Sequence, residues 1–236
     1  MTRFTMLELL LVVTIVVTLL ALFLPITSIA TQRSQRNLCM NNLRQTGITF
    51  DAYAEEHDGD LPANRQYMPL VVAADGESNS DIRTDLLAYT RDTRVFFCPA
   101  SPYVAPSAKE FAEFAYGKNT VHFQSYCLTA GYEPVPRTDG TTSQGLGQEP
   151  VFPADLRGAD RADQVMAADV ILARPVQLVG APGIPGWAYH RNQGTCLGGN
   201  VLRGDGHVVW TPVAEAQPRV RLYRPGDARA ITRFFW

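Results

Sequence analysis

The sequence predicts an α+β fold in which a long N-terminal α-helix, membrane-spanning in its first half, packs on a small antiparallel β-sheet domain. The first observation is that residues 9–24 contain no charged residue. The second is that apolar residues continue at helical spacing to about residue 56. The third is a pair of apolar runs on either side of Asp205-Gly206, which predicts a β-hairpin over residues 200–210.

The helix organises the chain into three parts. Residues 1–30 are expected to hold a leader and a transmembrane segment, since residues 9–29 in helical form reach about 30 Å. Residues 31–60 continue the helix, with a stripe formed by Cys39, Leu43, Gly47, Phe50 and Ala54. Residues 61–236 form an exported globular α+β domain, whose 16 prolines and 18 glycines indicate many loops.

Shorter elements follow in order along the globular domain. Helices are predicted at residues 81–90 and 109–116, and strands at residues 93–97, 124–129 and 165–169. Residues 133–161 and 175–186 are rich in Pro and Gly and are predicted to be loops. The segment 58–60, Asp-Gly-Asp before a Leu-Pro pair, is expected to end the long helix.

Glu8 is the one charged residue between positions 4 and 29. A carboxylate at the entrance to an apolar helix is costly, so it is expected to need a cation as a partner. On the apolar run alone, an ordinary single-pass anchor is the simplest interpretation.

The start of the chain, Phe4-Thr5-Met6-Leu7-Glu8 followed by an apolar helix, resembles the processing signal of type IV pilins and of type II secretion pseudopilins. The resemblance implies that a prepilin peptidase cuts before Phe4 and that the new N-terminus is methylated. It also implies that Glu8 pairs with the amino terminus of a neighbouring subunit, and that Pro25 kinks the helix. Arg3 stands where the family has glycine, which leaves open whether the leader is cleaved.

Two later segments carry the same resemblance. Cys39-Met-Asn-Asn-Leu-Arg-Gln and the segment ending in Cys98-Pro99 are similar to motifs of large pilin-like families. His190 followed by Asp205-Gly206 is similar to their C-terminal His…Asp-Gly motif. In this chain 14 residues separate the His and the Asp, against nine in the family, which indicates an insertion carrying Cys196.

The four cysteines lie far apart and form no Cys-x-x-Cys pair, a spacing that does not favour a structural zinc site. In an exported domain, Cys39, Cys98, Cys127 and Cys196 become disulfide candidates with three complete pairings. A Cys39–Cys98 bond would tie the long helix to the domain, and free buried thiols are the alternative.

Other residues are weaker candidates for metal binding or catalysis. Asp58 and Asp60 lie in an acidic loop that offers oxygens to calcium, but the EF-hand pattern is absent and a solvated capping loop is the favoured interpretation. Asp169, His190, Asp205 and His207 contain the residue types of a metal or acid–base site. The sequence carries no nucleophile elbow, no His-Glu-x-x-His and no phosphate-binding glycine loop, so no enzyme and no cofactor are predicted.

The resulting hypothesis is a structural subunit of a type IV pilus-like or type II secretion pseudopilus-like assembly. Its expected partners are the membrane, other pilin-like subunits in a homo- or hetero-oligomer, and a prepilin peptidase. The expected location is the bacterial inner membrane, as a single-pass protein with its C-terminal domain periplasmic or extracellular. A net charge of −2 gives no reason to expect nucleic acid. The alternative is an uncleaved, membrane-anchored extracytoplasmic protein that binds a ligand or metal, or a hydrolase.

Overall fold

The computed structural model describes residues 5–66, 71–74, 82–90, 92–101, 121–123, 125–134, 142–145, 152–157, 161–174, 177–178, 190–192, 195–223 and 232–235. Within these ranges the chain combines one very long helix with short helices and several antiparallel sheets. The predicted helix at residues 109–116 lies outside the described residues.

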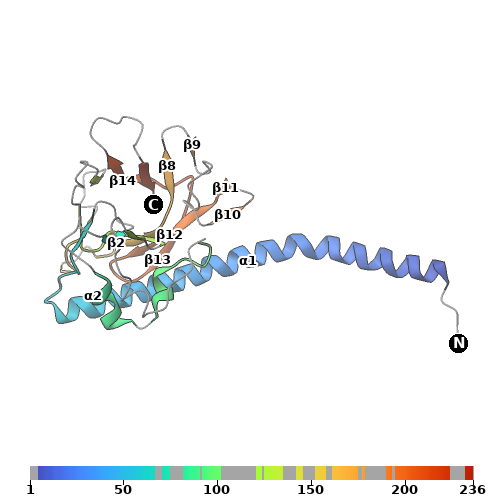
Figure 1. The fold of residues 1–236 in the computed structure, drawn as a ribbon, viewed down its shortest axis with the longest axis horizontal. Helices are drawn as coiled ribbons and strands as arrows, with labels where there is room; N and C mark the ends of the chain where they lie inside the picture. The colour runs from blue at the N-terminus through green and yellow to red at the C-terminus, as the bar shows by residue number, and fades with distance from the viewer. Residues whose placement is uncertain are drawn as a thin grey trace.

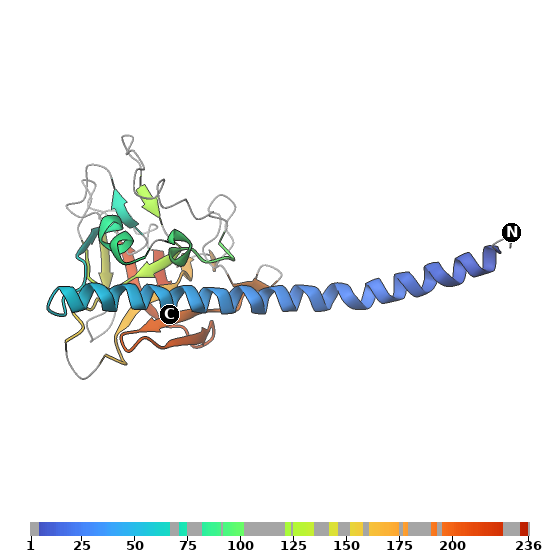
Figure 2. The ribbon, with the colours of Figure 1, turned by 90° about the horizontal axis from the view of Figure 1, so that it is seen from below.

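Helix α1 (Met6–Glu56) is 51 residues long, or about 77 Å at 1.5 Å per residue. It begins with a capping box, in which Thr5 and Glu8 bond to each other through side chain and backbone. It ends before Gly59, whose backbone N–H donates to the carbonyl of Ala54 at 2.8 Å. One half of α1 lies against the globular domain and the other projects away from it (Figures 1 and 2).

The predicted membrane span in the first half of α1 is wrong, and so is the single-pass inner-membrane location derived from it. Among the described residues, no helix combines the length and apolar character needed to cross a membrane.

The central sheet of the domain has four antiparallel strands in the order β13-β12-β7-β4. A second antiparallel sheet has the order β6-β14-β15-β8-β9, and three two-stranded pairs complete the described strands. The strands are β1 (Asn64–Gln66), β2 (Val71–Ala74), β3 (Val121–Phe123), β4 (Tyr126–Leu128), β5 (Tyr132–Pro134), β6 (Thr142–Gly145), β7 (Val165–Asp169), β8 (Leu172–Arg174), β9 (Gln177–Leu178), β10 (Arg191–Asn192), β11 (Thr195–Cys196), β12 (Gly198–Arg203), β13 (Val208–Pro212), β14 (Pro218–Tyr223) and β15 (Thr232–Phe235).

The main core lies between α1 and the central sheet. The predicted apolar stripe is confirmed, because Cys39, Leu43, Phe50 and Ala54 are all buried on the side of α1 that meets the domain. The predicted hairpin is also confirmed, with Val201 paired to Val209 across β12 and β13. The stripe therefore fixes which face of the helix rests on the sheet.

Two short helices flank α1. Helix α2 (Arg83–Tyr89) falls inside the helix predicted at residues 81–90. The strand predicted at residues 93–97 is wrong, because the chain forms a 3-10 helix there, η1 (Thr93–Phe96). The Asp92 side chain accepts a hydrogen bond from the backbone N–H of Arg94 and so starts a turn where apolar content alone indicated a strand.

Candidate functional site

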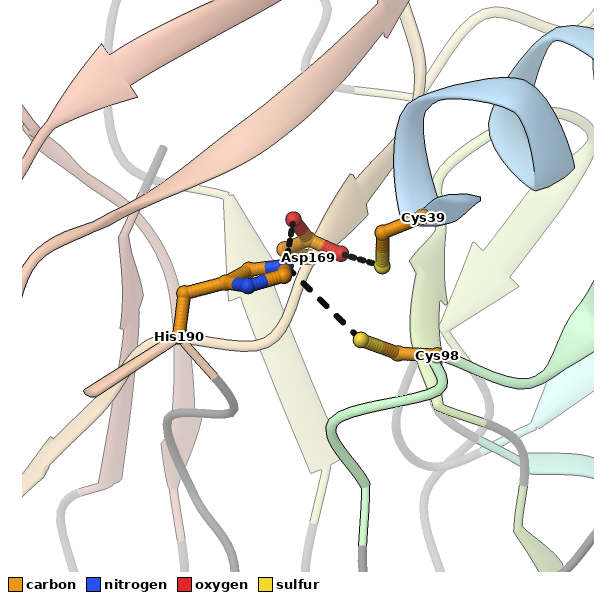
Figure 3. Close-up of side chains that lie close together, drawn as sticks. All are labelled: Cys39, Cys98, Asp169 and His190. Atoms are coloured by element: carbon orange, nitrogen blue, oxygen red, sulfur yellow. Dashed lines mark hydrogen bonds and ion pairs between the residues drawn. The ribbon is translucent and has the colours of Figure 1, made fainter. Parts of the chain in front are cut away.

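Four chemically reactive side chains meet where α1 crosses the central sheet (Figure 3). Cys39 comes from α1, Cys98 from the loop after η1, Asp169 from the end of β7, and His190 from the residue before β10. All four are buried, and the potential ligand atoms all lie within 4.8 Å of one another. We call this group the Cys–Asp–His cluster.

The contacts inside the cluster converge on one point. The Cys39 thiol donates to Asp169 Oδ1 at 3.1 Å, and His190 Nε2 lies 3.1 Å from Asp169 Oδ2. The same nitrogen, Nε2, lies 3.7 Å from the Cys98 sulfur. One imidazole nitrogen therefore faces both the carboxylate and a thiol.

Neighbouring polar groups hold the cluster in place. Asn200 on β12 donates two hydrogen bonds to Asp169 Oδ2, at 2.7 Å from its backbone N–H and 2.8 Å from its side-chain amide. The Tyr126 hydroxyl lies 3.3 Å from the Cys39 sulfur. The orientation of the Asp169 carboxylate is therefore fixed by the central sheet itself.

An aromatic ring packs against the cluster. Trp210 on β13 packs edge-on against His190, with ring centroids 5.5 Å apart. The guanidinium of Arg36 on α1 lies 3.8 Å from the Trp210 ring centroid, a cation–π contact. A cavity of about 190 Å³ is lined by these three residues and their neighbours on α1, and it leads to the imidazole.

The electrostatics of the cluster favour a positive charge at its centre. Burial raises the pKa of the Cys39 thiol well above its usual value. Burial acts in the same direction on Cys98, but hydrogen bonds with Cys39 and His190 outweigh it and lower the pKa of that thiol. Burial disfavours a charged imidazole, yet the bonds to Asp169 and Cys98 raise the pKa of His190 to about 10.

The same geometry bears on the chemistry that the cluster can perform. In a Cys–His–Asp nucleophilic triad, one imidazole nitrogen faces the nucleophile and the other faces the carboxylate. Here Nε2 of His190 faces both groups, and the Cys98 residue is only 1% exposed. The arrangement therefore matches four ligands around a shared centre better than a nucleophile and its base.

The structure places the predicted metal or acid–base residues at two separate sites. Asp169 and His190 belong to the cluster, whereas Asp205 and His207 contact each other in the exposed turn between β12 and β13. All four cysteines are buried thiols that form no disulfide bond. Cys127 on β4 and Cys196 on β11 are not members of the cluster.

In the acidic loop after α1, Asp60 is paired with a nearby positive charge. Asp60 forms an exposed ion pair with Arg157, whose guanidinium also lies 3.7 Å from Asp155. Asp58 is exposed and has a positive φ of 52°, as expected in the turn that ends the helix. The ion pair of Asp60 and the backbone conformation of Asp58 are those expected of a capping loop at the end of α1.

The start of α1 presents a second candidate site. Arg3 and Phe4 lie outside the described residues, and α1 continues through position 25 without interruption. Glu8 accepts hydrogen bonds from the Thr5 N–H and hydroxyl, both at 2.9 Å. The bond to the Thr5 backbone is the main reason why the pKa of Glu8 is lowered.

Residues 6–21 of α1, which we call the apolar segment, are exposed on every side of the helix. This part of the helix projects well beyond the domain (Figures 1 and 2). Every large apolar residue in it is about half exposed or more. Leu9, Val12, Val16 and Leu20, which lie on one face, are 48–56% exposed, and Leu10, Val13 and Val17 on another are 51–68% exposed.

Two features of the structure are not predicted from the sequence: the capping role of Glu8, and the contacts of two cysteines with an Asp and a His. The capping role had a readable signal, because Thr5-x-x-Glu8 before an apolar run is the capping-box pattern. The cluster had none, because its four residues are separated by 59, 71 and 21 positions (39 to 98 to 169 to 190). No family model, curated protein or solved structure matches the chain.

Proposed function

We infer that this protein is a structural subunit of a pilus-like assembly, in which copies pack through the apolar segment of α1. The observation that supports this most strongly is the exposure of Leu, Val and Ile side chains around the whole circumference of a projecting helix. A helix that is apolar on all sides is normally buried on all sides. The globular domain of the same chain does not cover it (Figure 2).

A second copy of the chain is the partner that best fits this surface. The apolar segment consists largely of Leu and β-branched residues, the side chains that helices use to interlock with one another. It carries a single charge, Glu8, at one end, so two copies placed side by side bring no charged residue into the middle of the contact. Several neighbours are needed to surround one helix, which favours an extended assembly over a dimer.

The first prediction concerns Val13, which is half exposed in the middle of the apolar segment. Val13→Glu is expected to weaken assembly at least about a hundredfold, because a carboxylate buried without a partner is strongly disfavoured. Sedimentation velocity of the full chain measures the effect as a shift from large species to monomer.

Ile48→Glu is the matched control. Ile48 is on the same helix and is more exposed than Val13, but it lies between Leu43 and Phe50, two residues that α1 buries against the domain. This variant is expected to assemble like the wild type. A wild-type chain that stays monomeric at all concentrations, or a Val13→Glu chain that assembles normally, would exclude the proposed function.

The second prediction separates the two roles available to Glu8. Glu8→Gln retains a side chain that completes a capping box but removes the charge, whereas Glu8→Ala removes both. If Glu8 pairs with the amino terminus of a neighbour, as the pilin resemblance implies, both variants lose most of their assembly. Only Glu8→Ala is expected to show faster amide hydrogen exchange in the first turn of α1. Wild-type assembly of the Gln variant would leave Glu8 with the capping role alone.

A further inference from the structure

We propose that Cys39, Cys98, Asp169 and His190 form a structural zinc site that fastens α1 to the central sheet. This proposal does not depend on the proposed function, because it concerns the buried half of α1 and not the apolar segment. The cysteine spacing does not favour a structural zinc site, because spacing reveals only ligands that are close together in sequence. The four ligands of this site are far apart in sequence.

The donor atoms select a soft or borderline metal ion. Two thiolates, one imidazole and one carboxylate provide sulfur, nitrogen and oxygen, and Zn²⁺ accepts all three in four-coordinate sites. Calcium and magnesium require sets of oxygen ligands, which the Cys–Asp–His cluster does not offer. An iron–sulfur cluster held by four cysteines is also excluded by the donor set.

The spacing of the donors also fits one ion. Bonds of about 2.0–2.3 Å from a tetrahedral zinc place its ligands about 3.3–3.8 Å apart. The closest donor contacts in the cluster are 3.1 Å, 3.1 Å and 3.7 Å, and no pair of ligand atoms is separated by more than 4.8 Å. Small side-chain adjustments are sufficient to bring all four to one centre.

The surroundings supply what a metal site needs beyond its ligands. A ligating carboxylate is usually held by hydrogen bonds, and Asn200 provides two to Asp169. The cavity beside His190 provides a path for the ion from the surface. Because all four ligand positions are filled by buried side chains, the site is closed and therefore structural.

The metal would also resolve the charge problem of the cluster. Three acidic groups, Cys39, Cys98 and Asp169, are buried around a single basic group, His190. A divalent cation in the centre neutralises two of the three negative charges that appear when both thiols ionise. It would also add metal–ligand bonds to the hydrogen bonds and packing that already join these four segments of the chain.

The experiment measures the metal content of the purified full-length chain by elemental analysis. One zinc ion per chain is expected for the wild type. Cys98→Ala is expected to bind zinc at least about a hundredfold more weakly, and Asn200→Ala about tenfold more weakly because Asp169 loses its support. Cys127→Ala is the matched control, since Cys127 is an equally buried cysteine outside the cluster, and it is expected to retain the ion.

A second measurement keeps the proposal testable if a variant fails to fold. Wild-type chain stripped with a chelator and reloaded with Co²⁺ is expected to show thiolate-to-cobalt charge-transfer bands and the intense visible bands of a tetrahedral site. Absence of these bands, zinc retained by Cys98→Ala, or a Cys39–Cys98 disulfide in the mass spectrum of the isolated chain would each overturn the proposal.

Discussion

Replacing Gly131 with alanine is expected to lower the free energy of unfolding by about 3 kcal/mol or more. Gly131 has a φ of +64°, which L-residues rarely adopt. A β-carbon there would lie 2.1 Å from the carbonyl oxygen of Pro62. The backbone has no freedom to move away, because its N–H donates to Pro153 at 2.7 Å and its carbonyl accepts from Asn64 at 2.8 Å. Urea unfolding followed by circular dichroism measures the loss.

Gly206 provides a control with a similar backbone conformation and no crowding. Its φ is +84°, and a β-carbon there would have no heavy atom within 4 Å. Gly206→Ala is therefore expected to cost only the backbone term, about 1–2 kcal/mol. Equal losses in the two variants would show that the Gly131 turn relaxes around the added methyl group.

Leu43→Ala is expected to cost about 3–4 kcal/mol. Leu43 is fully buried on the face of α1 that meets the domain, so truncating it removes apolar contact and leaves a cavity in the main core. Because Leu and Ala have similar helix propensities, the loss reports packing between α1 and the domain. Thermal and urea unfolding of the full chain provide the measurement.

Leu38→Ala tests the same substitution five residues earlier on α1, where the side chain is half exposed. Its expected cost is below about 1 kcal/mol, because little of the side chain leaves an apolar environment. A similar loss at positions 38 and 43 would contradict the assignment of the Leu43 loss to packing between α1 and the domain.

The sequence predicts elements whose patterns are local and fails where distant segments decide the outcome. The apolar stripe of α1 and the β12–β13 hairpin are readable, because helical spacing and an Asp-Gly turn are properties of neighbouring residues. The η1 segment cannot be predicted in this way, since the apolar composition of residues 93–97 is equally consistent with a strand.

The candidate metal ligands also depend on segments that are distant in sequence. Their residue types group Asp169 and His190 with Asp205 and His207, but the structure places Asp205 and His207 in a turn, where they contact each other and not the cluster. The actual partners of Asp169 and His190, which are Cys39 and Cys98, come from α1 and from the loop after η1. Only the packing of α1 across the sheet brings these segments together.

The way α1 rests on the domain has a mechanical consequence. A tension applied to the projecting end of the helix acts along its axis, nearly parallel to the surface on which residues 39–54 lie (Figure 2). The buried contacts of Cys39, Leu43, Phe50 and Ala54 then bear the load simultaneously, in shear, and are not peeled apart one after another. Detaching the helix would require all of these contacts to break together. The contact between α1 and the domain therefore resists pulling along the helix axis far better than bending of the helix away from the domain.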